Sequence, residues 1–168
     1  MMHVLIAYGS KGGSTAGLAR MIGDALESRD VEADVRPAHA VGAVDPYDGV
    51  IVAGALHANR WHRHARQFVR RNAKALRRRP VWLVSSGPLD DSARTGELKP
   101  VGQVARLAAA IDARGEVTFG GRLAPDATGF PARAMAKTRA GDWRDPDQVS
   151  EFATLVEAEL GKIDAMRP

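Results

Sequence analysis

The residues best suited to chemistry lie near the start of the chain, in a segment rich in glycine and hydroxyl side chains. This segment, residues 10–15, follows an apolar run at residues 4–7 that is typical of a buried strand, and it precedes a helical pattern. Backbone N–H groups at a helix start are unpaired, and the helix dipole adds positive potential there. The segment therefore predicts a phosphate-binding site. The alternative is a turn that only connects a strand to a helix.

Two common phosphate-binding motifs do not fit this segment, because it lacks the GK[ST] ending of a triphosphate loop and does not read G-x-G-x-x-G. It resembles instead the phosphate loop of flavodoxins, (S/T)-x-T-G-x-T, which wraps the phosphate of FMN. Gly12 stands where that family usually has threonine, and Lys11 adds a charge. The resemblance implies FMN as the cofactor. Its phosphate is then expected at Ser10, Lys11, Gly12, Gly13, Ser14 and Thr15.

Strand and helix patterns alternate along the rest of the chain. Apolar runs at residues 49–54 and 81–85 predict buried strands, and residues 117–121 are the last strand candidate. The polar–apolar alternation of residues 32–36 predicts a half-exposed or edge strand. We expect one α/β domain over residues 1–168, a flavodoxin-like doubly wound fold. Its five-stranded parallel sheet has the order 2-1-3-4-5, counted along the chain, with helices on both faces.

The expected helices have recognisable boundaries. Helical spacing of apolar residues runs from Trp61 to Leu76, and a further helix runs from Val101 and closes at Gly115. Asp145 and Pro146 form a capping residue followed by a first-turn proline, which predicts the start of the last helix. Residues 123–144 lack clean periodicity. We expect a short helix at residues 132–137 and a segment that covers a substrate pocket.

In doubly wound sheets the ligand lies outside the carboxyl ends of the strands, so the loops after residues 49–54 and 81–85 are expected to face the phosphate loop. In flavodoxin-like proteins these loops flank the isoalloxazine ring. The resemblance implies ring contacts for Leu56, His57, Trp61, Ser86, Gly87 and Leu89. Trp61 either stacks on or borders the flavin or packs in the core, and His57 is either a hydrogen-bond partner of the ring or a solvated loop residue.

A narrower resemblance rests on two stretches. Residues 50–69, VIVAGALHANRWHRHARQFV, are similar to the third strand, loop and helix of the menaquinone-dependent protoporphyrinogen oxidase family, and residues 141–145, GDWRD, are similar to its last part. That family carries a longer insertion after the fourth strand than residues 85–100 allow here. The resemblance implies an FMN-dependent oxidoreductase that transfers electrons or hydride, with a quinone as acceptor. No catalytic residue is assigned. The alternatives are a non-catalytic flavodoxin-type electron carrier and a flavodoxin-fold binding module that has lost the flavin.

The chain is basic, with a net charge of +4 and a pI of 9.8. A solvated helix exterior is one explanation of this charge, and docking to an acidic redox partner or peripheral contact with an anionic membrane is another. Nucleic acid is not expected as a partner, because no interleaved aromatic residues accompany the charge. The basic positions of residues 63–79 are Arg63, Arg66, Arg70, Arg71, Lys74, Arg77, Arg78 and Arg79.

Other features exclude whole classes of function. The chain has no cysteine, which excludes disulfides, cysteine-ligated iron–sulfur clusters and thiol catalysis. His62 and His64 lie two positions apart and are expected on different helix faces, so no metal site is predicted. No apolar run approaches the roughly 20 residues that cross a bilayer, and no signal peptide is apparent. A cytoplasmic location is expected, with peripheral membrane association as the alternative.

Overall fold

The computed structural model describes residues 1–11, 13–95, 98–123 and 140–168. Gly12 lies outside these ranges, as do the short helix expected at residues 132–137 and most of the segment expected to cover a pocket. Within the described ranges, no helix is long and apolar enough to span a membrane.

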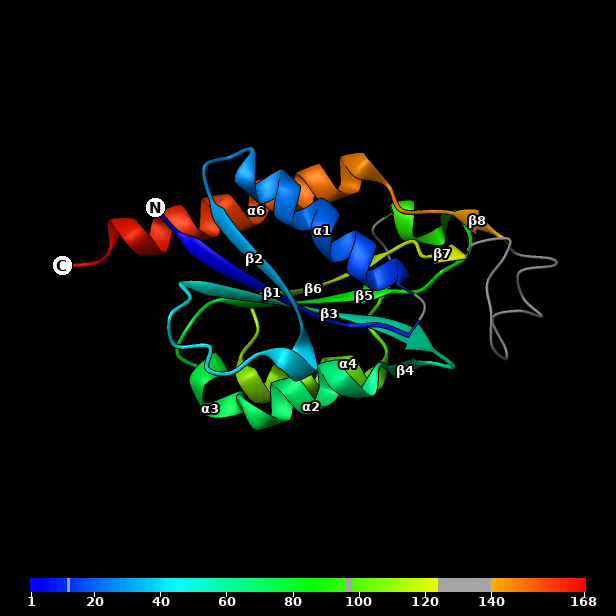
Figure 1. Ribbon diagram of the computed structural model, residues 1–168, viewed down its shortest axis with the longest axis horizontal. Coiled ribbons are helices and arrows are strands. Elements are labelled where there is room, and N and C mark those ends of the chain that lie inside the picture. The colour runs from blue at the N-terminus through cyan, green and yellow to red at the C-terminus, as the bar shows by residue number, and fades with distance from the viewer. Residues whose placement is uncertain (12, 96–97, 124–139) are drawn as a thin grey trace.

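A parallel sheet forms the centre of the fold, with the order β2-β1-β3-β5-β6 (Figure 1). This order confirms the predicted 2-1-3-4-5 arrangement of a doubly wound sheet. The half-exposed β2 lies at one edge, as its alternating sequence predicts. The strands are β1 (His3–Gly9), β2 (Glu32–Pro37), β3 (Gly49–His57), β5 (Val81–Ser86) and β6 (Gly115–Phe119).

Helices cover both faces of the sheet (Figure 1). On one face, α1 (Ser14–Glu27) and α6 (Pro146–Ala165) pack over alternate strand residues such as Ile6 and Trp82. On the other face lie α2 (Arg63–Arg71), α3 (Ala73–Leu76) and α4 (Gly102–Ile111), which enclose the intervening residues. The described residues also form two 3-10 turns, η1 (Ala38–Ala40) and η2 (Asp91–Thr95). The start of α6 confirms its prediction, because the Asp145 carboxylate accepts a hydrogen bond from the Asp147 N–H at 2.9 Å.

A hairpin replaces the loop expected after the third strand. The chain turns at Ala58 and Asn59, whose φ angles are 49° and 59°. It then returns as β4 (Arg60–Trp61), antiparallel to the end of β3, with Leu56 opposite Trp61. Trp61 therefore belongs to a strand rather than to the first turn of the predicted helix.

Trp61 is a core residue with 1% of its surface exposed. Its indole N–H donates to the carbonyl of Val84 at 3.3 Å, and its backbone N–H donates to the Gln103 side chain at 2.8 Å. The predicted role of Trp61 in stacking on or bordering a flavin is therefore wrong, because neither ring face is accessible. The alternative, a tryptophan in the same core cluster as Phe68, is what the structure has.

Two predicted helix boundaries are also wrong. The helix expected over residues 61–76 divides at Asn72, whose φ of −106° and ψ of 13° separate α2 from α3. The next helix ends at Asp112, which adopts the left-handed conformation with φ 52°, and Gly115 begins β6 instead. A short antiparallel pair follows, formed by β7 (Arg122–Leu123) and β8 (Gly141–Asp142).

The packing of Trp61 against Gly54 generates a test of the fold. A Cβ at Gly54 would overlap the indole, so Gly54→Ala is expected to lower the free energy of unfolding by about 1–3 kcal/mol. Urea denaturation at neutral pH measures this difference. Gly42→Ala is the matched control, because a Cβ there meets nothing within 4 Å, and its effect is expected within about 0.5 kcal/mol. An equal loss in both variants would contradict the assigned contact.

Candidate functional site

The predicted phosphate segment connects the end of β1 to the start of α1, where the helix dipole is positive. Gly13 adopts the left-handed conformation with φ 82°, and a Cβ there would meet nothing within 4 Å. The Ser10 hydroxyl oxygen accepts a hydrogen bond from the Gly13 N–H at 3.1 Å. No side chain caps α1, and its first turn contains no acidic residue. The start of the helix is thus open to an anion.

Thr15 provides the clearest sign that this segment fits a ligand. The residue is fully buried, and among the residues that the structure describes its hydroxyl oxygen has no hydrogen-bond partner. A buried polar atom without a partner destabilises a fold by about 1–3 kcal/mol, so such atoms are rare unless a function retains them. A phosphate oxygen at the start of α1 would accept the hydrogen bond that this hydroxyl can donate.

Ser14 connects the segment to the β7–β8 pair. Its hydroxyl oxygen accepts a hydrogen bond from the backbone N–H of Arg122 at 2.9 Å, which leaves the hydroxyl hydrogen available to donate. The exposed Arg122 side chain lies 3.9 Å from the Asp142 carboxylate. Arg122 and the exposed Lys11 therefore bring positive charge to this end of α1.

A second arginine near α1 is neutralised. Arg144 donates to both carboxylate oxygens of Asp142, at 2.9 Å and 2.7 Å. These hydrogen bonds lower the pKa of Asp142 and raise the pKa of Arg144, so the pair stays ionised. The guanidinium lies against Gly17, where a Cβ would overlap it. Arg144 thus holds β8 against α1.

The loops after β3 and β5 meet at the same edge of the sheet. The register pairs Gly9 with Gly54 and Ala55 with Ser86, so the carboxyl ends of the three central strands lie together. A Cβ at Gly87 would lie 3.0 Å from the Leu56 side chain, so the two loops are in contact.

The segment after β6 joins these loops to the phosphate segment. The Gly121 N–H donates to the carbonyl of Pro88 at 2.9 Å, and a Cβ at Gly121 would lie 3.5 Å from Leu89. The backbone N–H of Arg122, the next residue, donates a hydrogen bond to the Ser14 hydroxyl. Leu56, Gly87 and Leu89 are thereby brought toward the start of α1.

The remaining predicted positions differ in exposure. Ser86 is buried within β5, His57 is exposed at the end of β3, and Gly12 lies outside the described residues. Sequence reasoning did not place Trp143 at this site. Trp143 is partly buried, and its ring packs on Gly141. Its backbone N–H donates to the Gly121 carbonyl at 2.9 Å. The GDWRD sequence is the signal that could have indicated it.

Three histidines cluster at the start of α2. The His62 ring nitrogen accepts a hydrogen bond from the His64 N–H at 3.2 Å, and the two ring centroids are 4.9 Å apart. The expectation that His62 and His64 face different sides is wrong, because His62 caps the helix rather than lying within it. His39 lies 4.8 Å from His64, yet no group of metal-binding side chains in the described ranges is arranged to hold an ion.

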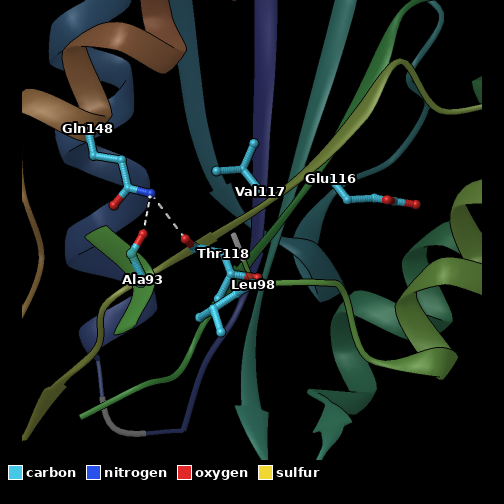
Figure 2. A pocket seen from close by; sticks show the side chains of 6 residues that line it. All are labelled: Ala93, Leu98, Glu116, Val117, Thr118 and Gln148. Atoms are coloured by element: carbon cyan, nitrogen blue, oxygen red, sulfur yellow. Dashed lines mark hydrogen bonds between the residues drawn. The ribbon is translucent and has the colours of Figure 1, made fainter. Parts of the chain in front are cut away.

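A small cavity lies beside β6 (Figure 2). The Gln148 amide donates to the carbonyls of Ala93 and Thr118, at 3.1 Å and 3.2 Å. At about 120 Å³ the cavity is far smaller than the roughly 300–1,000 Å³ of cofactor sites. Its lining residues are Ala93, Leu98, Glu116, Val117, Thr118 and Gln148.

Comparisons with known proteins agree with the observed topology. The sequence profile of the flavodoxin domain matches residues 5–142. No curated protein sequence matches the chain. Among solved structures, a flavodoxin from Streptococcus pneumoniae is similar, with a TM-score of 0.60 at 17% identity over 94% of this chain and 99% of that chain. Flavodoxin 2 from Bacillus cereus is similar, with a TM-score of 0.59 at 19% identity over 94% and 99%. A flavodoxin from the domain Archaea is also similar, with a TM-score of 0.55 at 14% identity over 91% and 99%.

The cap formed by His62 generates a prediction of pH-dependent stability. Burial, together with the charges of His64, Arg63 and Arg66, lowers the pKa of His62 below its ordinary value of 6.5. Below that pH the unfolded chain binds the proton more readily than the folded chain, so the free energy of unfolding falls as pH drops from 7 toward 5. His62→Asn retains a capping acceptor that does not titrate, and its pH slope is expected to be shallower than that of the wild type.

Urea denaturation at pH 8, 7, 6 and 5 measures both slopes. At pH 8 the two proteins are expected to agree within about 1 kcal/mol, since an asparagine cap replaces a neutral histidine cap. Parallel slopes over this range would show that the protonation of His62 does not oppose folding.

Proposed function

The chain belongs to the flavodoxin domain family, and from that membership we propose that it binds FMN and passes electrons between redox partner proteins. The observation that carries this proposal is the open start of α1 beside the buried, unpartnered hydroxyl of Thr15. A phosphate ester supplies the acceptor oxygens that both features lack. The proposed phosphate contacts are Ser10, Lys11, Gly12, Gly13, Ser14 and Thr15.

The flavin ring is proposed to lie against the loops that follow β3 and β5. Leu56 and Leu89 offer apolar surface there, and Gly87 allows a ligand close to its backbone. Ser86 contributes its backbone, and His57, exposed at the end of β3, offers a hydrogen-bond partner for the ring. When bound, FMN supplies one- and two-electron chemistry, and the protein supplies position, exclusion of water and electrostatics.

A second candidate is oxidation of a protoporphyrinogen with a quinone as acceptor. The similarity of residues 141–145 to that oxidase family favours it, because β8 and Trp143 lie beside the segment after β6. Anaerobic incubation with protoporphyrinogen IX, FMN and menadione tests it by the growth of porphyrin fluorescence. Growth that needs both FMN and menadione supports the oxidase. No growth, in a protein whose flavin is reduced and reoxidised by other redox proteins, supports the carrier.

Thr15→Val separates the proposed phosphate contact from a structural role. The change removes a buried hydroxyl that has no partner, so the FMN-free protein is expected to be as stable as the wild type or more stable. The affinity for FMN is expected to fall about tenfold, because one charge-assisted hydrogen bond is lost. Thermal denaturation without FMN and titration of flavin fluorescence give the two readouts. Unchanged affinity would remove Thr15 from the site.

Gly13→Asp tests the open start of α1 directly. It places a carboxylate beside the expected phosphate and a Cβ at a residue with φ 82°, so FMN affinity is expected to fall at least 100-fold. Riboflavin lacks the phosphate, and its weaker binding is expected to change little. Gly161→Asp is the control, because it adds the same charge in α6 where a Cβ meets nothing within 4 Å. Equal losses for FMN and riboflavin would indicate a distorted loop instead of a phosphate site.

A further inference from the structure

The helices on one face of the sheet carry cations without acidic residues among them. From residue 49 to residue 89 the chain contains no aspartate or glutamate. Over the same stretch it contains nine arginine and lysine residues, which begin at β4 and continue along α2 and α3. They are Arg60, Arg63, Arg66, Arg70, Arg71, Lys74, Arg77, Arg78 and Arg79.

Some of these cations hold the fold together. Arg71 donates to the carbonyl of Ala38 at 3.2 Å, and Arg77 donates to the carbonyl of Ala110 at 2.8 Å. Arg79 donates to the carbonyl of Val44 at 2.6 Å and has 12% of its side chain exposed. These three side chains are structural.

Five other cations of this stretch are exposed to solvent: Arg60, Arg63, Arg70, Lys74 and Arg78. We call this set the basic face. Within the described ranges, none of these five side chains forms an ion pair with a carboxylate. Their number and their lack of acidic neighbours distinguish the set from an ordinary exposed helix surface, where charges of both signs alternate.

The charged side chains of α6, on the opposite side of the sheet, are mostly acidic. The helix packs beside α1 there (Figure 1). It contains five acidic residues and one lysine, Lys162, and the capping residue Asp145 precedes it. The acidic residues of α6 are Asp147, Glu151, Glu157, Glu159 and Asp164. Several of these carboxylates form ion pairs, Glu157 with Arg29 and Glu159 with Arg114 and Lys162, so charges of both signs alternate on this side. The unbalanced positive charge therefore lies on the basic face. Charge concentrated on one face orients an approaching charged partner before contact.

The basic face begins at the edge of the sheet that carries the candidate FMN site. A Cβ at Gly9, the last residue of β1, would lie 2.8 Å from the His62 ring and 2.9 Å from the Ala65 N–H. The start of α2 therefore packs against the strand that leads into the phosphate segment. A partner held on the basic face lies next to that edge of the sheet.

We propose that the basic face docks an acidic redox protein. Four of its five side chains are arginines, whose planar guanidinium groups match carboxylates bidentately. The face offers no apolar side chain for insertion into a bilayer, because Phe68 and Val69 of α2 are buried and the exposed large apolar side chains lie elsewhere. That the partner is a redox protein rests on the proposed electron-carrier function. That it is acidic rests on the face alone.

The test compares two pairs of charge reversals. Arg63→Glu with Arg70→Glu changes the basic face, and Arg20→Glu with Lys162→Glu makes the same change of net charge on the α1–α6 side. The probe is a plant-type [2Fe–2S] ferredoxin, an acidic redox protein, and calorimetry at 50 mM salt measures its affinity with and without FMN. We expect the first pair to weaken binding at least tenfold and the second pair to change it less than threefold.

Several results would overturn the proposal. Equal losses in the two pairs would show that net charge alone governs binding, and unchanged binding in the first pair would remove the basic face. Wild-type binding to phosphatidylglycerol vesicles, without binding to ferredoxin, would assign the face to a membrane. If the variant with the first pair does not fold, as judged by circular dichroism, the variant with Arg63→Gln and Arg70→Gln replaces it. Its affinity for ferredoxin is expected to fall about threefold. Failure to bind FMN with ferredoxin binding intact would overturn the proposed function and leave the acidic partner standing.

Discussion

The contact between Trp61 and Gly54 fixes how the functional end of the sheet is built. Because Gly54 has no Cβ, the indole can pack directly on the end of β3, and the short hairpin returns the chain toward the core. The hydrogen bonds of Trp61 to Val84 and Gln103 then join β4 to β5 and α4. His62 follows at once and starts α2 against Gly9. One buried tryptophan therefore sets where the basic face begins and how close it lies to the phosphate segment.

The strands and their order could be predicted from the sequence because a parallel sheet buried on both faces requires continuous apolar runs. Such runs stand out in β1, β3 and β5, and the polar alternation of β2 marks an edge. Trp61 could not be placed in the same way. Its spacing from Ala65 and Phe68 fits a helical stripe, and the turn at Ala58 and Asn59 needs positive φ, for which alanine gives no signal. The burial of Trp61 in the core, rather than its helical spacing from Ala65 and Phe68, decides the conformation of this segment.

The candidate site was predictable in its chemistry and less so in its contacts. Glycine and hydroxyl residues after a buried strand indicated an anion site, and the open start of α1 fits that indication. The state of the Thr15 hydroxyl depends on what packs around it, which no spacing in the sequence reveals. Asp112 is similar, since its left-handed conformation ends α4 three residues before the glycine that the sequence favours for that task. The clustering of His62 and His64 likewise depends on the exact residue at which α2 begins.

The two proposed functional surfaces differ in physical character, and the difference suits the proposed carrier. At the phosphate segment, the buried Thr15 hydroxyl has no partner among the described residues and no side chain caps the first N–H groups of α1, so an anion there satisfies groups that otherwise destabilise the fold. A ligand bound in this way stabilises the folded state and is retained. The cations of the basic face are already hydrated, so each ion pair formed there contributes only about 0.2–1 kcal/mol and weakens with salt. Contacts of this kind assemble quickly and separate quickly. A protein that keeps its cofactor while it exchanges partners requires two kinds of surface. One is a site shielded from water whose unpaired polar groups bind the ligand. The other is a solvated charged surface that attracts a partner electrostatically over long range.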